Sequence, residues 1–222
     1  MKHSFFEVLI KPGEFFKAAI AEKESFKIPG LILLALGIVS AVNAYLIGGL
    51  TGKMISGLIP GMESIIAIST IIGAFLGVFV FWVVWAGVFY IISSLFKGKG
   101  TFKRSLEFLG YGYLPQIFGA ILTSIVALLY IPRIIVPHIT STATQDPQLI
   151  QEAVKTLMHD PAMMEMTQIT LLISIVFLLW SANIWIFGIQ KARNLSTRDS
   201  ALCVAIPVVG YILYLFYTMV VM

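Results

Sequence analysis

Residues 65–96 read IIAISTIIGAFLGVFVFWVVWAGVFYIISSLF and contain no charged side chain. A helix needs about 20 apolar residues to cross the hydrocarbon core of a bilayer, so this stretch is long enough to span a membrane with tilt. The whole chain has a matching composition, with 59% hydrophobic residues, 12% charged residues and a mean hydropathy of +0.95. Soluble domains carry about a quarter charged residues. The sequence therefore predicts an integral membrane protein.

Four more apolar stretches have the length of a membrane span. The predicted spans cover residues 28–47, 65–96, 114–131, 169–189 and 201–221. We therefore predict an all-α fold, a polytopic membrane bundle of five transmembrane helices over residues 28–222.

The longest loop between the spans, residues 132–168, is expected on the external side as an amphipathic helical element. Its apolar residues after position 147 fall on one helical face. Asp146-Pro147 and Asp160-Pro161 are both typical of a helix start, because an aspartate caps the helix and proline suits its first turn.

Lysine and arginine are distributed unevenly among the segments outside the spans. Of the 15 Lys and Arg residues, all but Lys53, Arg133 and Lys155 lie in the N-terminal segment, the second loop or the fourth loop. Cytoplasmic loops carry the excess of positive charge in membrane proteins. We therefore expect the N-terminus in the cytoplasm and the C-terminus outside.

The N-terminal segment, residues 1–27, is expected to form a cytoplasmic interfacial amphipathic unit in two pieces, broken at Pro12-Gly13. Acids and lysines alternate through it, so it does not have the pattern of a signal peptide. Two placements stay open. The apolar side chains can lie in the membrane surface with the lysines toward the headgroups, or they can pack under the bundle.

The second loop contains two stretches that look like functional motifs. GKGT at residues 98–101 lacks the first glycine of a phosphate-binding loop, because Ser93 stands in its place, and no strand precedes it. GYG at residues 110–112 follows Phe-Leu instead of the Thr-Val of a potassium filter, and at most one turn of helix precedes it. We predict a short flexible loop between two membrane helices.

Side chains that could carry catalysis are sparse. The predicted spans contain no Asp, Glu, Lys, Arg or His between their ends, whereas pumps and ion-coupled transporters need such groups. The single cysteine, Cys203, excludes a disulfide framework within the chain. Methionines near His138 and His159 are interpreted as apolar filler, with a copper site as the weaker alternative. We expect a non-enzymatic protein with no catalytic residue, cofactor, metal or nucleic-acid partner.

Polar and small residues in or near the spans are candidates for helix contacts. An asparagine in a span most often bonds to a neighbouring helix, and residues spaced like Gly73 and Gly77 let two helices approach closely. We expect that close contact within one chain, while a contact between protomers stays open. The candidate intramembrane polar residues are Asn43, Gln116, Asn183 and Gln190.

Several segments resemble the Yip domain family, the Ypt/Rab-interacting proteins. They are FEVLIKPGEFF at residues 6–16, IPGLILLAL at 28–36, GKGTFKRSL at 98–106, LGYGYLPQIF at 109–118, WSANIW at 180–185 and KARNLSTRDSAL at 191–202. The residues that carry the family motif, read as structural, are Gly100, Thr101, Phe102, Gly110, Tyr111 and Pro115.

The resemblance implies a five-span membrane protein with a cytoplasmic N-terminus, in agreement with the charge distribution. Eukaryotic members have a longer N-terminus with an Asp-Leu-Tyr-Gly-Pro motif and are implicated in vesicle traffic and Rab binding. That motif is missing here, so Rab binding is not carried over. We expect a minimal, prokaryote-type member in the cell membrane; a eukaryotic source would place it in the Golgi or endoplasmic reticulum.

Two functions follow as hypotheses. The first is a membrane-organising or partner-binding module acting through a basic cytoplasmic face, with anionic lipid headgroups or an unidentified membrane or cytoplasmic protein as partner and a homo-oligomer as a further option. The candidate residues of this face are Lys97, Lys99, Lys103, Arg104, Arg193 and Arg198. The alternative is a transporter or channel for a small solute, which requires a polar cavity between the helices.

Overall fold

A computed structural model describes residues 6–55, 62–137 and 147–221, and this part of the chain is helical apart from its connections. The elements are α1 (Glu7–Ile10), α2 (Pro12–Ala19), α3 (Lys27–Ile55), α4 (Met62–Leu95), α5 (Phe102–Tyr111), α6 (Leu114–Tyr130), the short 3₁₀ helix η1 (Ile131–Arg133), α7 (Pro147–Met158), α8 (Pro161–Arg193) and α9 (Thr197–Val221).

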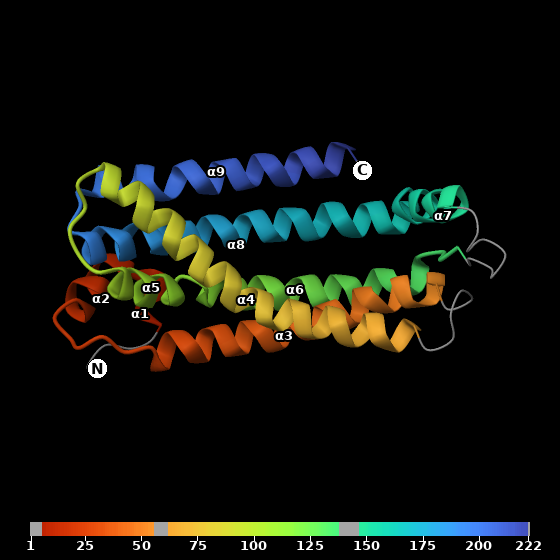
Figure 1. Cartoon of the computed structure of the whole chain (residues 1–222), viewed down its shortest axis with the longest axis horizontal. Coiled ribbons are helices and arrows are strands. Elements are labelled where there is room, and N and C mark those ends of the chain that lie inside the picture. The colour runs from red at the N-terminus through yellow and green to blue at the C-terminus, as the bar shows by residue number, and fades with distance from the viewer. Residues whose placement is uncertain (1–5, 56–61, 138–146, 222) are drawn as a thin grey trace.

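Five of these helices are long and apolar enough to cross a membrane, which confirms the predicted number of spans. They cover Lys27–Met54, Glu63–Leu95, Leu114–Arg133, Pro161–Arg193 and Thr197–Met219. The long helices lie side by side, with α1, α2 and α5 at one end of the bundle and α7 at the other (Figure 1). We call these the proximal end and the distal end. The loop of residues 96–101, which carries Lys97 and Lys99, and the turn of residues 194–196, which lies between Arg193 and Arg198, are both at the proximal end.

The fourth span begins earlier than the hydropathy of the sequence predicts. Asp160 accepts hydrogen bonds from the backbone amides of Ala162 and Met163, so α8 starts at Pro161 and not at residue 169. The predicted external element is therefore helix α7 alone, while residues 161–168 are the first turns of the span. The predicted start at Asp160-Pro161 is confirmed, and Asp146 and His138 lie outside the described residues.

The largest error of the sequence interpretation concerns residues 102–111, which form helix α5 and not a flexible loop. Thr101 caps this helix by accepting a hydrogen bond from the Arg104 amide at 3.1 Å. Ser105, Phe108 and Leu109, spaced three and four apart, are all buried against the bundle. This spacing is the signature of an amphipathic helix, and charged residues before it obscured the pattern.

The N-terminal helices pack under the bundle, and the predicted break at Pro12 is confirmed. Phe15 and Phe16 of α2 are buried, and Phe16 lies 4.8 Å from Phe108 of α5 between ring centroids. Phe6 and Ile10 remain 61% and 78% exposed at the rim of the same unit. The buried rings of α2 therefore pack against the bundle, while contact of the exposed Phe6 and Ile10 with the membrane surface stays a prediction.

Buried apolar side chains form two separate clusters. The proximal cluster joins α2, α3, α4, α5, α8 and α9, and its largest buried members are Trp185, Phe16, Phe89 and Phe108. The distal cluster is small and consists of Leu50, Met54, Ala127, Ile134, Leu157 and Met166. Between the two clusters the inward side chains are mostly small, which leaves space in the middle of the bundle.

Gly73 and Gly77 do not mediate the close helix contact predicted for them within the chain. A Cβ atom added at either position would have no atom within 4 Å. Close approach occurs instead at Gly37, where a Cβ would lie 3.0 Å from the Phe75 ring, and at Gly119, where it would lie 3.0 Å from the Phe177 ring. These two contacts join α3 to α4 and α6 to α8.

The mutation Gly112→Ala tests the packing of the proximal cluster. A Cβ at Gly112 would overlap the indole nitrogen of Trp185, which donates a hydrogen bond to the Leu109 carbonyl at 3.0 Å. Overpacking of this kind costs about 1–3 kcal/mol, so we expect the thermal midpoint to fall by several degrees. Tryptophan fluorescence of the purified protein measures it. Gly87→Ala is the matched control, because its Cβ would meet open space; equal midpoints for both variants would contradict this packing.

Candidate functional site

Arg193, the last residue of α8, joins three segments at the proximal end. Its side chain is only 3% exposed. The guanidinium donates hydrogen bonds to Ser93 Oγ at 2.9 Å, to Ser94 Oγ at 3.1 Å and to the Gly98 carbonyl at 2.8 Å. It also donates to the Gly100 carbonyl. Arg193 therefore fixes the end of α4 and the following loop onto the end of α8.

The partners of this buried cation are uncharged. Its charge lies at the C-terminal ends of α4 and α8, where the helix dipoles favour a cation. The Arg193 Cζ atom lies 4.0 Å from the centroid of the Tyr90 ring, a distance at which the ring face attracts a cation. The Lys99 amide completes the junction by donating to the Arg193 carbonyl at 2.7 Å.

The candidate family-motif residues surround this junction and its continuation into α5 and α6. Gly100 has a φ of +135°, and a Cβ there would overlap the Ala192 carbonyl oxygen. Gly110 lets α5 approach α3, since a Cβ would lie 2.6 Å from the Cβ of Pro29. Phe102 packs edge-on against Tyr90 at 5.5 Å between ring centroids.

Two further motif residues stabilise the same region. Tyr111 is buried and lies edge-on to Phe15 at 5.1 Å between ring centroids. Burial raises the pKa of its phenol to about 12, so it stays neutral. Pro115 is buried in the first turn of α6, where a proline is well tolerated. Each motif residue thus occupies a position in the packing of the proximal end.

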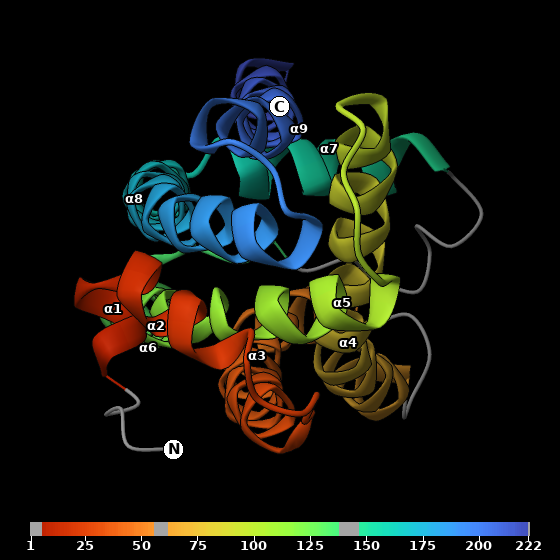
Figure 2. The same cartoon turned by 90° about the vertical axis from the view of Figure 1, so that its left-hand side faces the viewer.

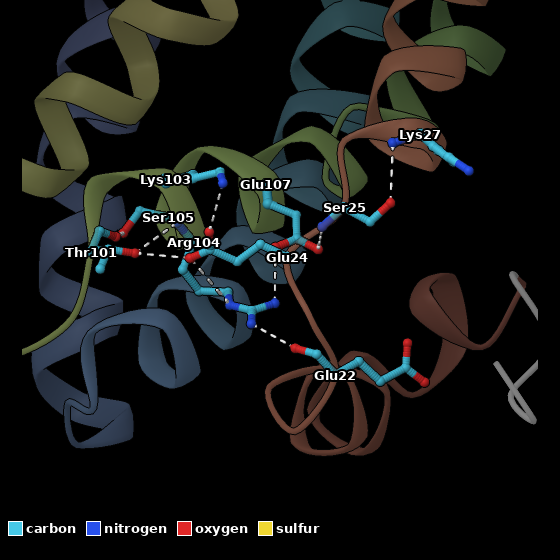
Figure 3. A network of polar contacts seen from close by, with 9 residues as sticks. All are labelled: Glu22, Glu24, Ser25, Lys27, Thr101, Lys103, Arg104, Ser105 and Glu107. Carbon is cyan, nitrogen blue, oxygen red and sulfur yellow. Dashed lines mark hydrogen bonds and ion pairs between the residues drawn. The ribbon is translucent and has the colours of Figure 1, made fainter.

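A polar network connects α5 with residues 22–27, which join α2 to α3 (Figure 3). Arg104 donates to Glu107 at 2.9 Å and to the Glu22 carbonyl at 2.7 Å. Glu24 lies 3.2 Å from Lys103 Nζ and accepts from the Thr101 hydroxyl at 3.1 Å. The network holds the N-terminal helices against the bundle.

The two carboxylates of this network differ in their environment. Burial raises the pKa of Glu107, and this effect exceeds the opposing hydrogen bond from the Ser25 amide and the charge of Arg104. Burial also acts to raise the pKa of Glu24, but hydrogen bonds from Lys103 and Thr101 outweigh it, so the pKa is lowered. Glu24 therefore keeps its negative charge beside Lys103 at neutral pH.

The six basic residues predicted for the cytoplasmic face divide into two groups. Arg104 and Arg193 direct their guanidinium groups into the protein, as described above. Lys97, Lys99, Lys103 and Arg198 are exposed at the proximal end, and Lys103 keeps 62% of its side chain exposed although it pairs with Glu24. We call these four cations the proximal basic face; Figure 2 views that end of the bundle, with α1, α2 and α5 in front.

A cavity of about 620 Å³ occupies the middle of the bundle. Helices α3, α4, α6, α8 and α9 all contribute to its wall. Most of its wall side chains are small or apolar; those on α4 include Gly73, Ala74, Gly77 and Val78. Gln116, Thr167, Thr170 and Ser174 are among its polar wall residues.

Aromatic rings close this cavity toward the proximal end. Trp185 stacks on Trp85 at 5.8 Å and lies edge-on to Tyr113 at 5.4 Å between ring centroids. Tyr211 lies edge-on to Trp85 at 5.8 Å. We call these four residues the aromatic layer; all of them also line the cavity.

The four candidate intramembrane polar residues take different positions. Asn43 donates to Thr123 Oγ1 at 3.1 Å and so joins α3 to α6, as predicted for an asparagine in a span. Gln116 donates to Ser181 Oγ at 3.1 Å and lines the cavity. Gln190 donates to Thr197 Oγ1 at 2.8 Å at the turn into α9, and Asn183 is exposed on α8.

Sequence reasoning missed Trp185, Tyr113 and the structural role of Arg193. Arg193 stands in a basic run typical of a cytoplasmic loop, so nothing in its neighbours indicates that it is buried. Trp185 falls in an apolar span, where the sequence does not distinguish a large side chain that faces the bundle from one that faces lipid. One sequence signal was available for this region. Gly112 stands between two tyrosines, and a glycine in such a position is typical of a site where another segment approaches the backbone closely.

His159 and the neighbouring methionines differ in burial at the distal end, where His159 and Met164 are exposed and Met166 is buried. The His159 ring lies 2.8 Å from the Lys155 carbonyl, and Met166 is buried in the distal cluster. Among the described residues, no group of three or more His, Cys, Asp or Glu side chains is placed to hold a metal ion.

The sequence profile of the Yip1 domain matches residues 6–219, almost the whole chain. The chain belongs to the Yip1 domain family. An uncharacterized protein of Methanocaldococcus jannaschii is 38% identical over 120 residues, which cover 53% of this chain and 83% of that protein. No solved structure is significantly similar to the chain. Membership of the Yip1 domain family and the five apolar helices establish an integral, multi-pass membrane protein.

The mutation Arg193→Lys tests the junction at the proximal end of this Yip1 domain. Lysine has no planar fork of donors, so it cannot reach two serine hydroxyls and two carbonyls together. Each buried acceptor that loses its partner costs about 1–3 kcal/mol, and we expect a loss of about 2–4 kcal/mol in the free energy of unfolding. Denaturant unfolding in detergent, followed by tryptophan fluorescence, measures this loss.

Arg198→Lys provides the control, because Arg198 is exposed at the same end and its replacement should leave stability within about 0.5 kcal/mol. If Arg193→Lys unfolds at the same denaturant concentration as this control, the junction does not have the role that its geometry indicates.

Proposed function

We propose that this Yip1 domain protein organises the membrane around it by binding anionic lipid headgroups at its proximal basic face, on the cytoplasmic side. The observation that supports this function is the grouping of four exposed cations, Lys97, Lys99, Lys103 and Arg198, at one end of the bundle. The distribution of lysine and arginine along the chain favours the cytoplasm for that end.

Exposed apolar side chains at the same end suit a membrane surface. Phe6 and Ile10 belong to the helical unit α1–α2, which is held against α5 and α8 by buried Phe15 and Phe16. Their exposed rings and alkyl groups would enter the interface while lysines of the same segment meet the headgroups. The unit is therefore a rigid attachment that presents both apolar and cationic groups to lipid.

The expected binding energy is modest and depends on salt. A lysine or arginine near an anionic membrane surface contributes about 1 kcal/mol, and the Debye length is about 8 Å at physiological ionic strength. The pairing of Lys103 with Glu24 reduces the contribution of Lys103 to this binding energy. Four cations of this kind enrich anionic lipids near the protein without binding a single lipid tightly.

A second candidate function is the movement of a small solute through the bundle, and the cavity of about 620 Å³ is the observation that favours it. The aromatic layer lies between this cavity and the proximal end, so transport requires Trp185 and its neighbours to move. Headgroup binding requires no such rearrangement, and for this reason we place it first.

Lipid selectivity measured with spin-labelled lipids tests the proposal. In reconstituted membranes the wild type should prefer spin-labelled phosphatidylglycerol over phosphatidylcholine, and 1 M salt should remove this preference because the Debye length falls to about 3 Å. Replacement of Lys97, Lys99, Lys103 and Arg198 by Gln should remove most of it. Electron spin resonance gives the fraction of motionally restricted lipid for each label.

The matched control replaces the distal cations Lys53, Arg133 and Lys155 by Gln and should keep the preference. Loss of selectivity in this distal variant, with the proximal variant unchanged, would overturn the proposal. Unchanged selectivity in both variants would also overturn it. If the proximal variant loses capture of a soluble acidic protein but keeps its lipid preference, the face binds a protein and not headgroups.

Cysteine labelling tests the orientation independently. Single cysteines at Lys99 and at Gln151, which is exposed on α7, are introduced in a Cys203→Ser background. In intact cells, an impermeant maleimide should label the cysteine at position 151 and should reach position 99 only after the membrane is opened. The reverse pattern would place the proximal basic face outside, and labelling of both from outside would contradict the five spans.

A further inference from the structure

We propose that the central cavity binds an uncharged, single-chain amphiphile of the membrane, such as a long-chain alcohol, with its hydroxyl at Tyr113. This inference is independent of the proximal basic face, because none of the cations of that face lines the cavity. It rests on the space, on the chemistry of the cavity wall and on one buried hydroxyl group.

The space arises from glycines whose open side faces the bundle centre. Gly73 and Gly77 of α4 both line the cavity, and a Cβ at either would have no atom within 4 Å. A volume of about 620 Å³ lies within the range of small-molecule sites, roughly 300–1,000 Å³. The cavity is therefore large enough for an alkyl chain.

The wall determines the chemical class of the occupant. None of the described residues that line the cavity is Asp, Glu, Lys, Arg or His. An ion placed there would lose its hydration without a counter-charge, which is far more costly than burial of a neutral group. Most of the wall is apolar, so the occupant needs an alkyl part and a small uncharged polar part.

Tyr113 indicates where the polar part binds. Its side chain is 7% exposed and lines the cavity, and its hydroxyl is buried with no hydrogen-bond partner in the described part of the chain. A buried hydroxyl without a partner costs about 1–3 kcal/mol. A phenol can both donate to and accept from an alcohol, so a bound hydroxyl would recover this loss.

Hydroxyl groups on α8 provide further acceptors along the cavity. Thr167, Thr170 and Ser174 donate to backbone carbonyls of their own helix at 2.7–3.0 Å. Their oxygen atoms keep lone pairs free to accept from a polar group in the cavity. These side chains tolerate a short polar head without offering a charge.

Exposed side chains of the cavity wall on α4 and α9 mark the lateral entrance that the proposal requires. Trp85 of α4 contacts Tyr211 of α9, and toward the distal end α4 crosses to α3 while α9 continues beside α8 (Figure 1). Phe81 on α4 and Tyr211 on α9 line the cavity and are 59% and 39% exposed. The entrance between them lies within the spanning helices, so the occupant arrives from the bilayer.

Photolabelling of the full-length protein in nanodiscs tests the proposal. The probe is hexadecanol that carries a diazirine and an alkyne, and mass spectrometry locates the adducts. We expect saturable labelling of the lining segments of α4, α8 or α9. Gly73→Leu combined with Gly77→Leu should reduce this labelling about tenfold or more, because the added side chains occupy the cavity.

Two control variants keep the cavity open. Gly87→Leu on α4 and Gly210→Leu on α9 also add a side chain where a Cβ meets open space, but neither residue lines the cavity. Both should label like the wild type. Equal labelling of the cavity-filling variant and these controls would overturn the proposal, and so would labelling that does not saturate.

The mutation Tyr113→Phe tests the polar contact. Loss of one hydrogen bond of about 0.5–1.5 kcal/mol should weaken the apparent affinity for the hexadecanol probe up to about tenfold. The ligand-free variant should be at least as stable as the wild type, because an unpaired buried hydroxyl has been removed. An unchanged affinity, or a ligand-free protein that melts earlier, would contradict the role assigned to Tyr113.

A diazirine-bearing palmitate, which differs from the alcohol by its carboxylate, tests whether the occupant of the cavity must be uncharged. The alcohol should label the cavity more strongly at equal concentration. Equal or stronger labelling by palmitate would overturn the assignment of an uncharged occupant. Uptake of a small neutral solute by proteoliposomes, abolished in the cavity-filling variant without any labelling by the alcohol, would instead assign the cavity to transport.

Discussion

The arrangement of the proximal end depends on one buried cation, the guanidinium of Arg193. Its hydrogen-bond partners are uncharged hydroxyl and carbonyl groups, and the negative ends of two helix dipoles provide the compensating field. A planar fork of donors meets these partners at once, which an ammonium group cannot do. The end of α4, the loop after it and the end of α8 are therefore fixed relative to one another.

This junction sets the direction in which α5 leaves the loop, and α5 in turn positions the N-terminal helices. Arg104 and Glu107 of α5 bind the segment that joins α2 to α3, and Phe108 packs on Phe16 of α2. The dense packing of the proximal end contrasts with the open middle of the bundle. The densely packed proximal end can thus keep its exposed cations in fixed positions, and the open middle of the bundle has room for a ligand.

The sequence predicted the number of spans because a run such as residues 65–96 leaves no alternative, and it predicted the grouping of basic loops from charge alone. It could not show that Arg193 is buried, since burial depends on Ser93 and Gly100, about a hundred residues away. Helix α5 was missed because its apolar stripe is short and follows a basic run. Gly73 and Gly77 look like a helix contact in sequence, and only the structure shows that they line a cavity, with no atom near the position of an added Cβ.

The central functional claim is that anionic lipid gathers at the proximal end. The most direct measurement uses phosphatidylglycerol with a photoreactive group in its headgroup, and maps its adducts on the reconstituted protein beside those of the matching phosphatidylcholine. We expect phosphatidylglycerol to give more adducts than phosphatidylcholine in peptides with Lys97–Lys103 and Arg198, and no such excess around Lys53 or Lys155. Equal adducts from both lipids at the proximal end, or an excess at the distal end, would contradict it.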